Sequence, residues 1–353
     1  MFLPLQSFRG FFALSIVLMH FRINTNIHKS DFIQNASLAV DFFFVLSGFI
    51  IAFKYQEKIK FKDNFLFFIK KRFLRLYPLH ILTLFICIII ELLKLYAQNN
   101  TNFNVSYLAF ESHNNFISLI KNIFLIQGFS GWSFNQPSWS ISTEFYTYVL
   151  FGLVIYRFIQ PYKFFLLLVF VSGIIIYLNN SYSSLAIYIN LERTLYSFFI
   201  GVITLSLYKK KSEKINYHLP LCFIIISLLY ISEAHKLDKN ISYLIAAFLF
   251  SFTIFFTAKL NKDNLLYKLL SNNFLVYLGT ISYGIYMIHS PVIWFFRQIA
   301  RFIFIIPEDD QHALIFEKYT GEIFTLLIIM LIILLSHISL HYFENKFRYK
   351  DKK

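Results

Sequence analysis

The sequence predicts an all-α, polytopic membrane protein with about ten transmembrane helices and both termini in the cytoplasm. Of the 353 residues, 57% are hydrophobic and only 15% are charged, and the mean hydropathy is +0.58. Several apolar segments reach the roughly 20 residues that a helix needs to cross a bilayer. The apolar runs are continuous rather than alternating, which favours helices over a β-barrel. We interpret residues 1–353 as one integral-membrane domain.

The expected spanning helices follow the apolar runs, and basic residues orient them. Most of the 33 Lys and Arg residues fall on one side if the N-terminus is inside, as the positive-inside rule requires. A further apolar stretch, 116–129, is short and is expected to be interfacial or re-entrant rather than spanning. The ten expected spans are 5–23, 38–56, 73–96, 139–159, 162–179, 193–208, 217–233, 240–258, 273–297 and 322–343.

Two classes of function are disfavoured by the composition. The net charge of +14 does not indicate nucleic-acid binding, because the basic residues lie in short loops where membrane topology alone places them. Cys87 and Cys222 lie inside apolar runs and are interpreted as small core residues. No metal-ligand spacing occurs in the sequence, so we expect neither a metal nor a tightly bound cofactor.

The first span carries an arginine and a histidine in an otherwise apolar run. Arg9 and His20 are eleven residues apart, which places both on one helix face within about 20° and about 16 Å apart along the axis. Ionisable groups at such depth usually face a protein interior or a water-filled cavity. The sequence therefore predicts a cavity along this face.

Three further titratable residues are expected near the depth of His20, in the outer half of the membrane. Asp41, in VDFFFVLSGFII, would accept a hydrogen bond from an imidazole, or would instead cap its helix. Glu144, in PSWSISTEFYTYVLFG, is a functional candidate or belongs to a solvated helix start. His289, in ISYGIYMIHSPVIW, is a cavity-facing or a structural histidine.

A basic cluster is expected at the opposite, inner end. Arg72 and Arg75, in KKRFLRLYPLH, are three residues apart, and guanidinium groups suit phosphates bidentately. The alternative is a topology signal that contacts lipid headgroups. Glu344, at the inner edge of the last span, is expected to pair with an inner arginine such as Arg75. A path from an anionic cytoplasmic ligand to an outer polar site fits this pattern, and so does a proton-coupled transporter.

Five stretches in this order resemble the acyltransferase-3 family of integral-membrane O-acyltransferases. They are LQSFRGFFALSIVLMHF, VDFFFVLSGFII, KKRFLRLYPLH, PSWSISTEFYTYVLF and ISYGIYMIHSPV, and the closing YFENKF is similar to the family's last motif. In the family's first motif a basic residue is followed, after ten intervening residues, by a histidine, and Arg9 and His20 have this spacing. Its usual acid in the first motif is replaced by Gln6 or Ser7, and the chain resembles the stand-alone form without an SGNH domain. The residues that fall on family motifs are Arg9, His20, Arg72, Arg75, Trp139, Ser140 and Glu144.

The resemblance implies a bacterial inner-membrane enzyme. It would transfer an acyl group, which we expect to be acetyl, from cytoplasmic acyl-CoA to a hydroxyl of a surface polysaccharide or a lipid-linked glycan such as lipopolysaccharide. Its partners would be acyl-CoA, the carbohydrate acceptor and membrane lipid, with no nucleic acid. The competing class is a non-enzymatic transporter or exporter.

The resemblance also implies roles for individual residues. His20 would be the base, or would carry the acyl group transiently, and Asp41 or Glu144 would orient it. Arg72 and Arg75 would hold donor phosphates, and Arg9 would stand at the inner end of the thioester channel. The candidate cavity-lining residues are Ser47, Trp139, Ser140, Tyr283, Tyr286 and His289.

Overall fold

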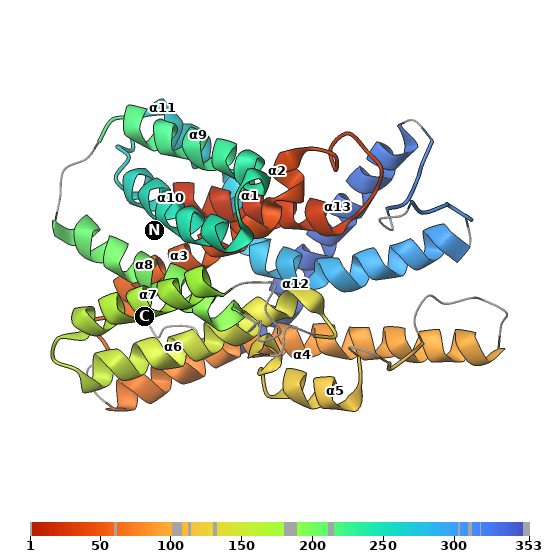
Figure 1. The fold of residues 1–353 in the computed structure, drawn as a ribbon, viewed down its shortest axis with the longest axis horizontal. Coiled ribbons are helices and arrows are strands. Elements are labelled where there is room, and N and C mark those ends of the chain that lie inside the picture. Colours follow the sequence, from red (N-terminus) through yellow and green to blue (C-terminus); the bar gives the residue numbers. More distant parts are fainter. Residues whose placement is uncertain are drawn as a thin grey trace.

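The structure, a computed structural model, is helical throughout the part of the chain that it describes. That part comprises residues 2–59, 62–100, 108–111, 114–129, 133–179, 189–210, 215–302, 304–309, 313–317 and 319–348, and in these ranges only isolated β-bridges occur outside helices and loops. Figure 1 shows the long helices running roughly along one direction. They are α1 (Leu3–His20), α3 (Ala39–Tyr55), α4 (Lys62–Asn100), α6 (Trp139–Arg157), α7 (Pro161–Leu178), α8 (Asn190–Lys210), α9 (His218–Glu233), α10 (Lys239–Ala258), α12 (Asn273–Phe302) and α13 (Thr320–Ile338).

Short elements connect the long helices. They are α2 (Asp31–Gln34), α5 (Phe116–Ile123), α11 (Leu265–Leu270), α14 (Asn345–Phe347), four 3₁₀ turns η1 (Ala36–Leu38), η2 (Gln127–Phe129), η3 (Gln136–Ser138) and η4 (Ala234–Lys236), and a π-helical turn η5 (Ser339–Glu344).

Each of the ten expected spans coincides with one of these long helices. Among the described residues, six helices are long and apolar enough to cross a membrane, namely those over 36–55, 64–100, 161–178, 218–236, 239–258 and 320–347. The remaining long helices, α1, α6, α8 and α12, carry the charged and polar side chains of the site described below, which lowers their hydropathy. The protein therefore has the helices of a multi-pass membrane protein, and the count of ten spans stays a prediction.

The stretch 116–129 does not form a spanning helix, as expected. It contains the eight-residue helix α5 and the short turn η2, and eight residues rise only about 12 Å. Phe116 and Ile117 on α5 are exposed, whereas Asn122 is fully buried, donates to the carbonyl of Ser118 in the same helix and accepts a hydrogen bond from Ser133. The helix thus presents an apolar face outward and a polar face inward, which suits an interfacial position.

Helices α1 and α12 run parallel and in close contact. A Cβ atom on Gly10 would lie 2.6 Å from Leu278 Cβ and 2.9 Å from the backbone nitrogen of Gly279, so only glycine permits this approach. Ten residues further along each helix, the rings of His20 and His289 lie 5.0 Å apart. The two contacts are ten residues apart on α1 and ten residues apart on α12. They therefore fix a parallel register of these two helices over about 15 Å.

A second close contact joins α3 to α8. A Cβ atom on Gly48 would lie 1.9 Å from the carbonyl oxygen of Phe198, so the two helices pack closely at this glycine. Around this contact the largest buried side chains are phenylalanines, including Phe49 and Phe199. Helices α3 and α8 therefore form the centre of the main hydrophobic core.

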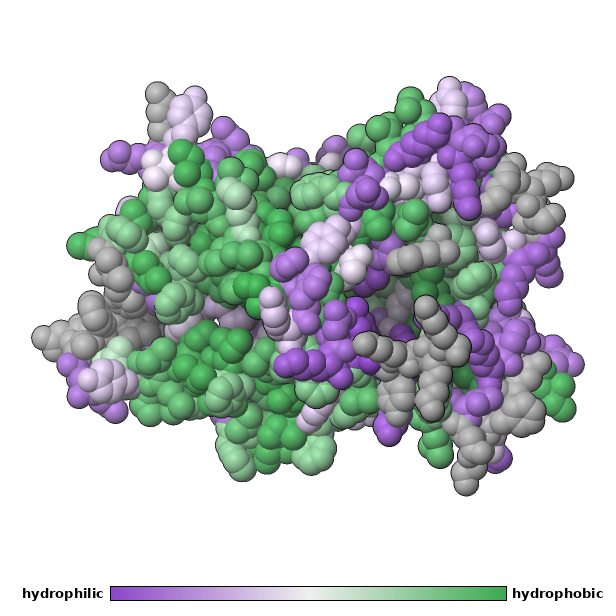
Figure 2. Space-filling model, turned by 180° about the vertical axis from the view of Figure 1, so that it is seen from behind, coloured by the Kyte–Doolittle hydropathy of each residue, from purple (hydrophilic) through white to green (hydrophobic). Residues whose placement is uncertain are grey.

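The surface is apolar over broad areas. Figure 2 shows large regions of hydrophobic residues on one face, with hydrophilic residues gathered toward the ends and in a central patch. Only 17% of the residues in helix α7 are buried, and Leu166, Leu167 and Phe170 are among the exposed ones. Exposed apolar area of this extent is expected where lipid is the solvent.

Candidate active site

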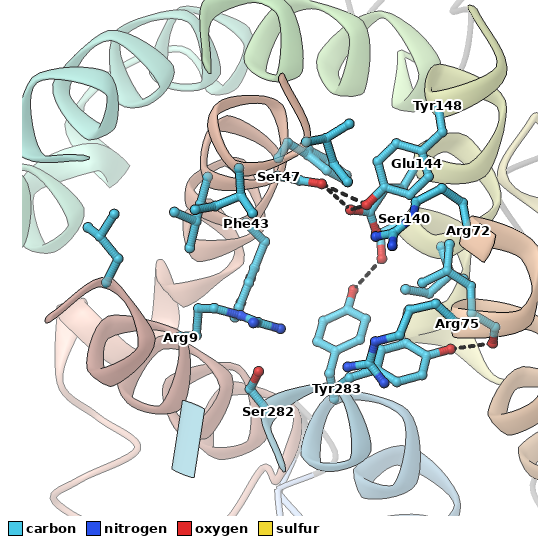
Figure 3. Close-up of a pocket in the computed structure, with 18 of the residues that line it drawn as sticks. Arg9, Phe43, Ser47, Arg72, Arg75, Ser140, Glu144, Tyr148, Ser282 and Tyr283 are labelled. Carbon is cyan, nitrogen blue, oxygen red and sulfur yellow. Dashed lines mark hydrogen bonds between the residues drawn. The ribbon is translucent and has the colours of Figure 1, made fainter. Parts of the chain in front are cut away.

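A cavity of about 590 Å³ lies between α1, α3, α4, α6 and α12. Its charged lining residues are Arg9, Lys54, Arg72, Arg75 and Glu144, so cations outnumber anions in the lining. Figure 3 shows Arg9 reaching into the cavity from one side, with Arg72 and Arg75 on the other. The structure thus brings together the three arginines that the sequence analysis singled out.

The two arginines of α4 face the cavity because residues three apart share one side of a helix. Arg72 donates to the hydroxyl of Tyr55 at 3.0 Å and lies over its ring at 5.1 Å. The buried Nε of Arg72 has no hydrogen-bond partner among the described residues. At least one N–H of this guanidinium is therefore not satisfied by the described residues.

Arg75 is held more firmly than Arg72. Its guanidinium donates to Glu344 Oε2 at 2.6 Å, which confirms the predicted pairing with Glu344. Arg348 donates to the same carboxylate oxygen at 2.9 Å, and the Tyr283 ring lies 5.0 Å from Arg75. The hydroxyl of Tyr283 in turn donates to the carbonyl of Leu76 at 2.5 Å and ties α12 to α4. The segment that follows α13 thus anchors one side of the cavity.

Glu144 lies in this cavity and not beside His20. Ser47 donates to Glu144 Oε1 at 2.7 Å, and Tyr148, one turn further along α6, donates to the same oxygen at 2.5 Å (Figure 3). Ser47 and Tyr148 also contact each other at 2.7 Å. The expectation that Glu144 shares the surroundings of His20 is wrong, because depth along a helix does not say which neighbour the side chain faces.

The candidate lining residues divide into two groups. Ser47, Ser140, Tyr283 and Tyr286 line the cavity, whereas Trp139 and His289 are not among its lining residues. Ser140 and Tyr286 contact each other at 2.8 Å, and both donate to the carbonyl of Pro137. This contact fixes the start of α6 against α12.

Asp41 is part of a buried ion pair. Arg193 of α8 donates to both of its carboxylate oxygens, at 2.9 Å and 2.6 Å, and Ser197 donates at 3.1 Å. The guanidinium also lies 3.8 Å from the Tyr243 ring centre. The predicted contact between Asp41 and His20 is therefore replaced by a pair with Arg193.

His20 instead approaches His289. Besides the ring contact at 5.0 Å, His20 Nδ1 contacts the carbonyl oxygen of Ile16 at 2.9 Å. The ring of Tyr286, which lines the cavity, lies 5.9 Å from that of His289. Tyr286 therefore lies between the arginine cavity and His289.

A second hollow, of about 290 Å³, adjoins the cavity and shares Lys54 with it. Among the described residues, Lys58 and Lys71 line it together with Glu57, which pairs with Lys209 at 3.8 Å. The positive lining thus continues beyond the cavity. No group of three or more candidate metal ligands occurs in the described ranges.

Sequence reasoning missed Arg193, Tyr148 and Lys54. An arginine at the start of an apolar helix, as at Arg193, was the available signal, since it requires an acidic or aromatic partner. Tyr148 follows Glu144 by four residues, a spacing that places both on one helix face. Lys54 ends a long apolar run and is most simply interpreted as a topology signal.

Two curated proteins show partial similarity to the chain. The "Acyltransferase MdmB" of Streptomyces mycarofaciens is 31% identical over 125 residues, which cover 33% of this chain and 28% of that protein. The "Protein 2 in picA locus" of Rhizobium radiobacter is 38% identical over 99 residues, covering 25% of this chain and 47% of that protein. The matched region thus spans less than half the length of either relative.

The family comparison covers far more of the chain. No solved structure matches. The family model described as "Acyltransferase domain" matches residues 5–342, which include the five motif stretches from LQSFRGFFALSIVLMHF to ISYGIYMIHSPV and every cavity residue named above. The chain therefore belongs to the acyltransferase-3 family.

Proposed function

We propose that this protein transfers an acyl group, acetyl in the first instance, from acyl-CoA to a hydroxyl of a surface polysaccharide or lipid-linked glycan. The donor would enter from the cytoplasm and the acceptor from outside a bacterial inner membrane. One observation carries the proposal: Tyr286, which lines the cavity together with Arg9, Arg72 and Arg75, also lies against His289 of the His20–His289 pair.

The positive cavity suits the phosphates of a coenzyme A thioester. Guanidinium groups bind phosphate oxygens through charge-assisted hydrogen bonds, and Arg72 has donor capacity that no described residue uses. Lys58 and Lys71 in the adjoining hollow extend the charge to a donor with several phosphates. Membrane topology alone would place cations near this end, but it does not require them to line a shared cavity.

The distance between the arginines of the cavity and the two histidines suits an elongated donor. Gly10, next to Arg9, and His20 are ten residues apart on α1, which corresponds to about 15 Å. A thioester at the end of a pantetheine arm would have to extend over such a distance from its phosphates. The arginines would then hold one end of the donor while the reacting carbonyl lies near the histidines.

His20 would act as the base. Its Nε2 would take the hydroxyl proton of the acceptor while the hydroxyl oxygen attacks the thioester carbonyl carbon. The C–O bond forms, the C–S bond breaks, and the proton passes to the departing thiolate. A variant of this route forms a transient acyl-imidazole on His20 before the acceptor attacks.

The test uses membranes that contain the protein. Wild-type membranes should release free coenzyme A from acetyl-CoA, and the cell-surface glycan should gain the mass of acetyl groups relative to cells without the gene. His20→Gln keeps hydrogen bonding and approximate size but cannot serve as a base near neutral pH, so it should abolish both signals at unchanged abundance. Glycan acylation at the wild-type rate by His20→Gln would refute the role of His20. Membranes that transport a glycan without consuming thioester would favour the transporter instead.

A further inference from the structure

The side chain of His289 carries an unexplained polar atom. His289 is fully buried, and its Nε2 has no hydrogen-bond partner among the described residues. An unpaired acceptor in a protein interior is costly, which calls for a partner in some state of the molecule. The ring centre of His20 lies 5.0 Å from the ring centre of His289, so the His20 ring is a neighbour that can supply such a partner atom.

The tautomers of both rings follow from their contacts. His289 Nδ1 contacts the carbonyl oxygen of Ile285 at 3.2 Å, and His20 Nδ1 contacts that of Ile16 at 2.9 Å. A carbonyl oxygen only accepts, so each Nδ1 carries the hydrogen. In the neutral state both rings therefore present a lone pair on Nε2, and neither can donate to the other.

The local backbone holds His289 in this position. Pro291 lies inside α12 and has no N–H, which leaves the carbonyl of Met287 without its helical partner. Asn135, from the segment before α6, donates its side-chain amide to that carbonyl at 2.9 Å. His289 thus lies in a turn of α12 where Pro291 removes one helical hydrogen bond and the Asn135 side chain replaces it. The facing helix, α1, is fixed in register at Gly10.

Neither carboxylate expected to support His20 is in place to do so. Asp41 is bound by Arg193 and Ser197, and Glu144 by Ser47 and Tyr148. From the segment after α1, the charge of Arg22 acts on His20 electrostatically. From α12, the Tyr286 ring approaches His289. A charged His20 therefore needs an acceptor that these groups do not supply.

We propose that His289 is a positioning residue that accepts the Nε2–H of His20 once His20 has taken the acceptor's proton, an inference that rests on the proposed function. In the step, the hydroxyl proton moves to His20 Nε2, the C–O bond forms and the C–S bond breaks. The resulting imidazolium donates to His289 Nε2 until its proton passes to the thiolate. The two imidazoles thus share one proton between their Nε2 atoms.

Three variants separate this role from packing. His289→Leu removes the acceptor atom, and His289→Gln keeps an acceptor oxygen near the place of Nε2. His80→Gln is the matched control, because His80 is also buried with one unpartnered ring nitrogen and lies outside the cavity lining. If His289→Leu does not accumulate, His289→Met serves as the second variant without a comparable acceptor.

The first readout does not depend on acyl transfer. Diethyl pyrocarbonate modifies neutral imidazole, so the rate at which the His20 peptide is modified across pH reports the protonation of His20 directly. In His289→Leu the midpoint of this profile should move to lower pH, because the proton on His20 loses its acceptor. His289→Gln should restore much of the shift, and His80→Gln should match the wild type. An unchanged midpoint in His289→Leu would overturn the proposal.

The second readout is acyl transfer in the same membranes. Loss of a hydrogen bond to a charged group should slow His289→Leu by on the order of 10- to 100-fold with unchanged donor affinity, and His289→Gln should recover part of the rate. Equal activity of the Leu and Gln variants would also overturn the proposal. Wild-type membranes without acyl transfer, but with the midpoint shift, would refute the proposed function while the His20–His289 pairing stands.

Discussion

Replacing Arg72 or Arg75 should weaken donor binding, but the two changes should differ in their effect on the fold. Both side chains line the cavity. Replacing either one should remove a charge-assisted phosphate contact worth about 1.5–3 kcal/mol. That corresponds to a loss of donor affinity of about 10- to 150-fold. The difference arises from what each arginine contacts when no donor is bound.

Arg72→Ala removes a hydrogen bond to Tyr55 and leaves no buried acid unpaired. Arg75→Ala takes away a partner of Glu344, which is 4% exposed and is then held by Arg348, itself 29% exposed, and by a 3.5 Å contact with Ser339. Breaking a buried pair on one side costs about 3–5 kcal/mol, and the remaining bonds reduce that figure. Arg75→Ala should therefore lower the melting temperature clearly, and Arg72→Ala should hardly change it.

The assay measures acetyl-CoA binding and thermal unfolding on the same purified, detergent-solubilised variants. Arg72→Lys should recover only part of the affinity, because lysine cannot make the bidentate contact. Wild-type affinity in Arg72→Ala at full abundance would refute the donor-binding role and leave the arginine pair as a topology signal. Equal thermal shifts in both alanine variants would refute the reasoning about Glu344.

Three further predictions concern other parts of the molecule. Asp41→Asn should reduce protein abundance more than turnover per molecule, because it leaves the charge of Arg193 buried and unpaired at a cost of about 3–5 kcal/mol. Replacing both Asp41 and Arg193 by apolar residues should reduce abundance less, and fluorescence size-exclusion chromatography measures abundance in each case. Glu144→Gln should leave protein abundance near the wild-type level, since Ser47 and Tyr148 can still bond an amide oxygen; a clear loss of abundance would indicate that the charge is needed for folding. Cysteines at Lys58 and Leu108 should be labelled from opposite sides of the membrane, and labelling of both from one side would contradict the ten-helix topology.

The helices and the inner arginine cluster could be predicted from the sequence because both depend on local pattern. Apolar runs of sufficient length mark the helices, and the spacing of Arg72 and Arg75 places them on one face. The pairing of Arg75 with Glu344 could be predicted as well, because both lie at the same end of their helices. These inferences need only the position along each helix.

The partners of Asp41 and Glu144 could not be predicted in the same way. Position along a helix fixes depth, but the neighbour depends on rotation about the axis and on which helices are adjacent. Asp41 faces α8 and meets Arg193, whereas His20 faces α12 and meets His289. The order of helices around the bundle follows from long-range packing, such as the contact at Gly48, that no local pattern encodes.

The close, parallel packing of α1 against α12 has a consequence for substrate size. Arg9 and Tyr283 at one end, and His20 and His289 at the other, belong to the same two helices. Because Gly10 leaves no space for sliding, the interval between these ends behaves as a rigid spacer rather than an adjustable one. Donors with a longer acyl chain would have to fit by bending that chain into the apolar part of the cavity, near Phe43, since the interval itself cannot lengthen. Selection by acyl length would then depend on the side chains that fill this space, whereas the reach from phosphate to thioester would be common to all donors.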